Sequence, residues 1–175
     1  MTGPAAAEFS RPVLLARVGA ERFRQEIAAS EAERAALARR FDLIALDRLS
    51  AAVELVRHGK EMFLLRATFD AEFVQSCVVT LDPVRGAVSE EFTLLLGPPE
   101  VEAEAAGTVG DEIAFEPLVG DRVDIGEAVA QEFALALPPF PHSPDAEGEA
   151  EPRTPAPDEA GPFAALSRLV GRRGE

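Results

Sequence analysis

The chain has 175 residues, of which 47% are apolar, and this suits one domain with a buried core plus tails. Its single cysteine excludes an intramolecular disulfide framework, and no apolar run approaches the roughly 18 residues that span a bilayer. The N-terminus also lacks the basic region and apolar stretch of a signal peptide, so we expect a cytoplasmic protein without membrane contact. The net charge of −14 disfavours direct nucleic-acid binding by the main body.

The first 40 residues predict two short strands and a helix. Residues 9–17 and 21–28 have the composition of strands, with a glycine-containing turn between them. Ser30 and Glu33 then form a capping box, because each side chain can accept a hydrogen bond from the other's exposed backbone N–H. A helix is therefore predicted from Ser30 to about Arg40.

The middle of the chain predicts three strands. Apolar residues alternate with other residues over 49–55, and residues 58–60 form a plausible hairpin turn. The clearest strand covers 62–73, where every second side chain is apolar on one face and the other face becomes increasingly polar. A proline-containing break separates it from a further strand over 84–96.

The next 40 residues predict a loop, a strand and the strongest helix. Residues 100–110 are acidic, small and glycine-containing, which predicts a mobile loop. A short strand is expected over 113–118. Asp124 can cap a helix that reaches Leu137, with Glu127 three residues after the cap and two prolines at the end.

Together these elements predict an α+β domain over residues 1–137, with a mostly antiparallel sheet and two helices packed against it. Residues 138–161 are rich in proline, alanine and acidic residues, which predicts a disordered acidic linker. Residues 162–175 predict a short helical element with Phe163 and Leu166 on one side. This element can dock on its own domain, or bind a partner protein, RNA or a membrane after tethering by the linker.

Charge is distributed unevenly along the chain. Residues 1–85 carry 12 acids and 12 bases, whereas residues 86–134 carry 12 acids and one base, Arg122. Such an acidic block steers basic proteins toward itself. The alternative interpretation is a solvated surface that keeps the protein soluble.

No constellation of catalytic groups is visible in the sequence. The two histidines, His58 and His142, fall at a turn and in the predicted linker, and no phosphate-binding glycine motif is present. We therefore expect no enzymatic activity, no cofactor, no metal and no small-molecule substrate, while an unrecognised active site stays an alternative. Cys77, flanked by valine, is more typical of a small buried hydrophobe than of a reactive thiol.

Several stretches, in this order, resemble the YceD-like family. They are the helix at 30–41, the strand expected around Cys77, the run 123–138 and the closing stretch 161–169. The family comprises bacterial and plastid proteins associated with the accumulation of large-subunit ribosomal RNA. The resemblance implies a role in making this RNA or the large ribosomal subunit, without an established enzymatic activity.

One position departs from the family pattern. Many members have Cys-x-x-Cys where this chain has Cys77 and Thr80. Two cysteines at that spacing can supply half of a zinc site, and one cannot, so a metal-dependent or redox role is not expected. The family's Glu and Leu-Pro positions map onto Glu132, Leu137 and Pro138. A solvated helix carboxylate is the alternative interpretation of Glu132.

The resemblance and the charge distribution agree if the protein binds a basic ribosomal protein or assembly factor and affects ribosomal RNA indirectly. In this hypothesis an acidic block mimics nucleic acid: Glu100, Glu102, Glu104, Asp111, Glu112 and Glu116. The residues predicted to bind the partner are Glu132, Leu137, Pro138, Phe163, Leu166, Arg168, Glu102, Glu104, Asp111 and Glu112. The alternative is direct RNA binding through Arg34, Arg39, Arg40 and the terminal arginines.

Overall fold

The computed structural model describes residues 7–19, 22–101 and 113–144. The chain divides into two units, residues 1–143 and 144–175, and the architecture below is that of the first unit. Its elements in chain order are β1 (Pro12–Leu14), η1 (Leu15–Arg17), β2 (Phe23–Ala28), α1 (Glu31–Arg40), β3 (Ala45–His58), β4 (Met62–Ser76), β5 (Pro83–Gly97), η2 (Pro99–Val101), β6 (Ala114–Pro117), β7 (Arg122–Asp124) and α3 (Ile125–Ala136).

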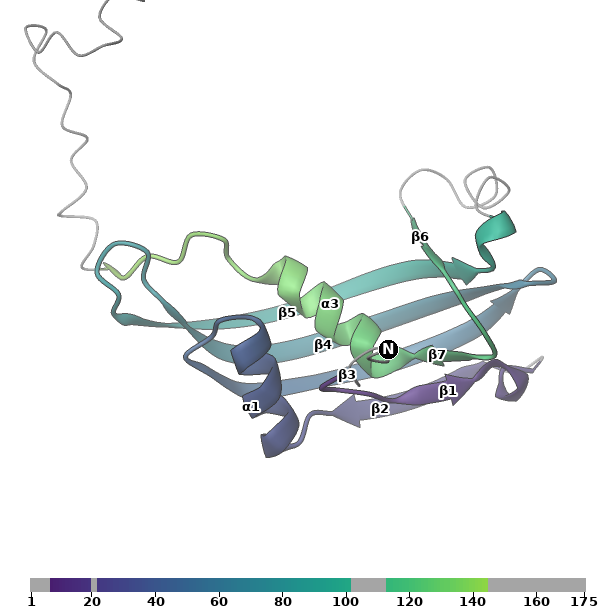
Figure 1. Cartoon of the computed structure of the whole chain (residues 1–175), viewed down its shortest axis with the longest axis horizontal. Helices are drawn as coiled ribbons and strands as arrows, with labels where there is room; N and C mark the ends of the chain where they lie inside the picture. Colours follow the sequence, from purple (N-terminus) through teal and green to yellow (C-terminus); the bar gives the residue numbers. More distant parts are fainter. Residues whose placement is uncertain (1–6, 20–21, 102–112, 145–175) are drawn as a thin grey trace, which may run out of the picture. The chain divides into compact units, whose positions relative to one another are not determined.

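The main sheet has five strands in the order β2-β3-β4-β5-β6, which is the order of the chain (Figure 1). Its first three pairings are antiparallel, and the short β6 pairs with β5 in parallel. The remaining strands, β1 and β7, form a separate antiparallel pair. The prediction of an α+β fold with a mostly antiparallel sheet is confirmed.

Strands β3, β4 and β5 are 14 or 15 residues long, and alternation of side chains explains which face each residue takes. In β4, Phe63, Phe69 and Phe73 are buried on the inner face together with the small residues between them. Gly59 adopts a φ of 72° in the turn between β3 and β4, a conformation that glycine adopts without strain. Gly86 of β5 leaves room for the Phe73 ring, since a Cβ there would lie 2.5 Å from it.

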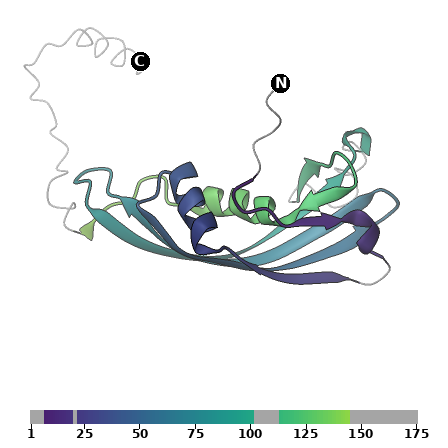
Figure 2. The same ribbon diagram turned by 60° about the horizontal axis from the view of Figure 1, so that its bottom comes forward.

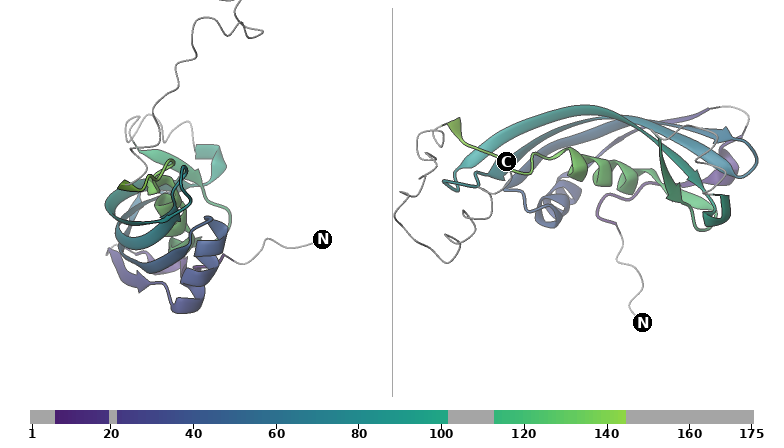
Figure 3. Two further views of the ribbon diagram at one scale, coloured as in Figure 1. Left: turned by 90° about the vertical axis from the view of Figure 1, so that its left-hand side faces the viewer. Right: turned by 90° about the horizontal axis from the view of Figure 1, so that it is seen from above.

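Both helices cover the same face of the sheet (Figures 2 and 3). The predicted capping box is present in α1, where Ser30 and Glu33 accept hydrogen bonds from each other's backbone. Asp124 caps α3 by accepting from the backbone N–H of Gly126 and Glu127. The two packed helices are thus confirmed, with boundaries close to those predicted.

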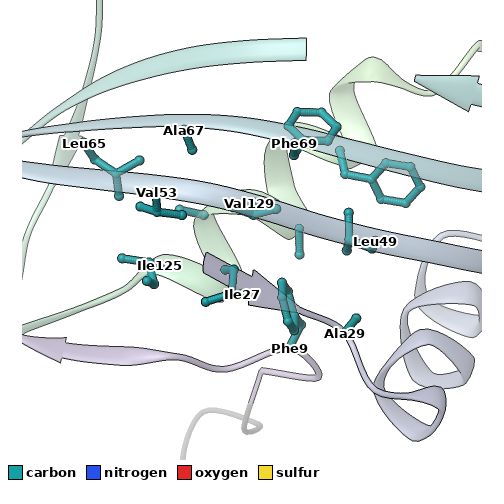
Figure 4. Packing of buried hydrophobic residues seen from close by; sticks show 14 of the residues in the cluster. Phe9, Ile27, Ala29, Leu49, Val53, Leu65, Ala67, Phe69, Ile125 and Val129 are labelled. Carbon is teal, nitrogen blue, oxygen red and sulfur yellow. The ribbon is translucent and has the colours of Figure 1, made fainter. Parts of the chain in front are cut away.

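The apolar core lies between these helices and the sheet. From α3, Ile125 and Val129 point toward buried residues of the central strands, and Phe9 and Ile27 close the core at its β2 side (Figure 4). The Phe133 ring meets the rings of Phe41, Phe69 and Phe73 at centroid distances of 5.7–6.4 Å and steep angles. Such edge-on aromatic contacts add to the burial that fixes α3 on the sheet.

The strands differ from the prediction at three places. The strand expected over 9–17 is only Pro12–Leu14 and pairs with β7 rather than extending the main sheet. Strand β7 was not predicted, because three residues are too few to show a period. Cys77 lies in the turn after β4 and not on a strand.

The segment after α3 begins as an ordered part of the first unit. Residues 138–143 were assigned to a disordered linker, yet the carbonyls of Pro138 and Pro141 accept hydrogen bonds from Gln75 and Val78. Residues 138–143 of the predicted linker thus contact the end of β4 and the turn after it, and belong to the first unit. The rest of that linker, the predicted helical element at 162–175 and most of the predicted loop at 100–110 lie outside the described residues. Within the part described, no helix is long and apolar enough to cross a membrane.

Candidate functional site

Three carboxylates from three different elements lie around one edge of α3. Glu90 is on the inner face of β5, because it stands opposite the buried Phe69 in the β4–β5 register. Glu116 comes from β6, the strand next to β5, and Glu132 from α3, directly before the core residue Phe133. We call Glu90, Glu116 and Glu132 the acidic face.

The environment of Glu132 and Glu116 disfavours the negative charge of both carboxylates. Partial burial raises the pKa of Glu132, and the neighbouring charges of Glu116 and Glu90 raise it further. Burial likewise raises the pKa of Glu116, followed by repulsion from Glu127. A positive charge placed here would relieve both effects.

The described residues do not supply that positive charge. No arginine, lysine or histidine among them lies within ion-pair distance of Glu90, Glu116 or Glu132. Arg122, the one base of residues 86–134, pairs at 3.2 Å with its neighbour Asp121.

A small cavity adjoins the acidic face at the start of α3. Its volume is about 120 Å³, and it lies between β6, β7 and the first turn of the helix. Glu116, Asp124 and Glu127 line it together with Arg122 and apolar groups. Glu127 already pairs with Arg40, and Asp124 caps α3, so Glu116 is the carboxylate of this lining that neither caps a helix nor pairs with arginine among the described residues.

The opposite side of the domain pairs its charges internally. Arg11 makes two hydrogen bonds to Glu33, at 2.6 and 3.0 Å, and these hold the pKa of that carboxyl at about 2. Arg22 and Arg24 both pair with Glu54 at the β2–β3 edge.

The three helix arginines considered for RNA binding do not form a free basic cluster. Arg34 donates to the carbonyl of Ala29, and Arg40 pairs with Glu8 and Glu127 across α1 and α3. Arg39 is exposed. Direct RNA binding by these residues stays a prediction, and Arg39 is the one of the three that makes no ion pair or side-chain hydrogen bond among the described residues.

Of the residues predicted to bind a partner, three fall within the described ranges. Glu132 is half-buried on the acidic face, Leu137 is the C-cap residue of α3 and packs against the core, and Pro138 is exposed. The remaining seven lie outside those ranges: Glu102, Glu104, Asp111, Glu112, Phe163, Leu166 and Arg168. Glu90 was missed, although an acid at an inward position of a strand was a usable signal.

Cys77 is fully buried, as expected, in a turn that closes over its sulfur. Its Sγ accepts backbone hydrogen bonds from Val79, Thr80 and Ser143 at 3.3–3.5 Å. Hydrogen bonds from the Thr80 side chain and then from the backbone lower the pKa of Cys77 to about 6, against the opposing effect of burial. The described residues contain no group of three or more His, Cys, Asp or Glu that could hold a metal ion.

Comparison with protein families shows a match to a family model described as large ribosomal RNA subunit accumulation protein YceD, over residues 65–169. The matched stretch is more than half of the chain. The chain belongs to the YceD family. Searches of the curated proteins and of the solved structures find no match.

The residues that match the YceD model include the acidic face. The matched stretch contains β5, β6 and α3, and therefore all three residues of the acidic face. The helix at 30–41, which contributed to the resemblance seen in the sequence, lies outside the matched residues. The paired charges of β2 and α1 are outside it as well.

Proposed function

We propose that this protein supports the accumulation of large-subunit (23S) ribosomal RNA, or ribosome biogenesis, as a non-enzymatic factor that binds a basic ribosomal protein or assembly factor. The observation that carries the proposal is the acidic face: Glu90, Glu116 and Glu132 converge without a cation among the described residues. Membership of the YceD family supplies the link to large-subunit ribosomal RNA.

Physical chemistry favours a basic protein as the ligand of this face. A lysine or arginine of the partner would be attracted by three carboxylates, two of which are partly desolvated already. The same negative charge repels a phosphate backbone, so the effect on ribosomal RNA would be indirect. Ribosomal RNA would then accumulate because a protein that packages it is delivered or protected.

The test is affinity capture of the tagged full chain from growing cells, with and without nuclease treatment of the lysate. The proposal expects basic large-subunit ribosomal proteins or assembly factors to be retained after nuclease. Recovery that disappears with nuclease would contradict it and would favour direct RNA binding through Arg34, Arg39, Arg40 and the terminal arginines.

A further inference from the structure

Strand β2 forms one edge of the main sheet, and no strand of the described residues pairs with its outer side. At the end of this edge the Ala28 carbonyl accepts a hydrogen bond from Arg11. In an antiparallel ladder, alternate residues direct both backbone groups toward the neighbouring strand. The backbone N–H of Ala29 donates to Leu49 of β3, so Ile27 and Gln25 also face β3. Glu26 and Arg24 therefore direct their backbone N–H and C=O groups outward from the sheet edge, in the plane of the sheet.

The side chains of this edge are accessible. Arg24, Gln25 and Glu26 are exposed, with 70% of the Arg24 side chain open to solvent even though it pairs with Glu54. An accessible edge with free backbone groups can accept a further strand.

We propose that this edge binds a second copy of the chain by antiparallel pairing of β2 with β2 about a twofold axis at Gln25. In that register Arg24 stands opposite Glu26 of the second copy, and Glu26 opposite its Arg24. Phe23 stands opposite Ile27 on the inner face in the same way. Opposite charges and apolar residues thus meet their complements on both faces.

Backbone direction and charge favour this register over registers shifted by one or two residues. A shift of one position would set outward backbone groups against inward ones, and no ladder could form. A shift of two would bring either Arg24 against Arg24 or Glu26 against Glu26, and like charges directly opposite are destabilising. The Gln25-centred register exchanges about four backbone hydrogen bonds through the two Arg24–Glu26 pairs.

The dimer would join two five-stranded sheets and leave both acidic faces free. The acidic face lies at the β5–β6 side, which is the other end of the strand order from β2. Self-association is thus independent of the proposed partner binding, and either can fail without the other.

Sedimentation velocity of the full chain, from about 5 to about 500 μM, tests the proposal. We expect concentration-dependent dimers, and we expect E26R and R24E each to weaken association about tenfold or more, because each sets like charges opposite one another. An equimolar mixture of E26R and R24E should restore dimers, since both cross-strand pairs then become attractive. In R24E, Arg22 still pairs with Glu54, and circular dichroism verifies the fold.

The control is E91R, which makes the same charge change at an exposed position of β5, away from the edge. It should dimerise like the unmodified chain. A chain that stays monomeric throughout the concentration range, a mixture that does not restore dimers, or an E91R variant weakened as much as E26R would each overturn the proposal.

Discussion

The two ends of the main sheet, β2–β3 on one side and β5–β6 on the other, differ in whether their carboxylates are paired with arginine. On the side of β2, β3 and α1, carboxylates such as Glu33 and Glu54 are each paired with arginine. On the side of β5, β6 and α3, Glu90, Glu116 and Glu132 have no such partner among the described residues. Since the strand order follows the chain order, a charge change along the sequence near residue 85 becomes a charge difference across the sheet.

We attribute the paired charges to stability of the fold and the unpaired carboxylates to binding. Paired charges on the first side stabilise the fold, because removing one partner leaves the other unsatisfied. On the second side, Glu116 and Glu132 are partly buried and unpaired among the described residues, which costs free energy. A binding surface is one setting in which such a cost is retained. Neutralising a carboxylate should therefore have opposite effects on the two sides.

The largest effect is expected on the paired side. E33Q should lower the free energy of unfolding by about 1.5 kcal/mol at pH 7, because it weakens the two hydrogen bonds from Arg11 and the one from Ser30. The pKa of Glu33 is lowered from 4.5 to about 2, so its stabilisation is fully present above pH 4.5. The difference between E33Q and the unmodified chain should disappear as the pH falls toward 2.

Urea unfolding followed by circular dichroism measures this difference, since the chain has no tryptophan or tyrosine for fluorescence. The matched control is E31Q, which removes an exposed carboxylate from the same first turn of α1. A loss in E33Q no greater than in E31Q would show that the Arg11 pair does not stabilise the fold.

A smaller effect of opposite sign is expected on the acidic face. E132Q should raise the free energy of unfolding by about 0.5 kcal/mol at pH 7, because burial and the charges of Glu116 and Glu90 penalise the ionised form. The pKa of Glu132 is raised in the folded state, so this penalty is present above the folded pKa and decreases as the pH falls through it. The gain should vanish below about pH 4.5.

The same unfolding experiment gives the outcome, with E91Q as the control that removes an exposed carboxylate from the outer face of β5. A destabilised E132Q variant would mean that Glu132 has a stabilising role in the free protein, and the electrostatic contrast between the two sides would be lost.

Much of the fold could be predicted because its main elements carry strong local signals. The inner face of β4 shows a strict period of two from Phe63 to Phe73, and the capping residues Ser30 and Asp124 mark where α1 and α3 begin. Strands β1 and β7 lack such a signal, because each owes its existence to three backbone pairs between distant segments.

The site was less predictable, since it depends on contacts between distant segments. The acid-rich block was visible in the sequence, but only the β4–β5 register places Glu90 beside Glu132 and Glu116. Ser143 donates a hydrogen bond to Cys77, which is 66 positions away, and no periodic pattern in the sequence predicts this contact. The sequence shows which residues are charged, whereas only the tertiary structure shows which of them lie close together.

The most direct test of the account is quantitative capture with the acidic face reversed in charge. Tagged E116K/E132K should retain at least about tenfold less basic protein after nuclease treatment than the unmodified chain. E61K/E91K, which makes the same charge change at two exposed residues outside that face, should retain as much as the unmodified chain. Equal retention by E116K/E132K, in a variant that circular dichroism shows to be folded, would contradict the acidic face as the binding surface.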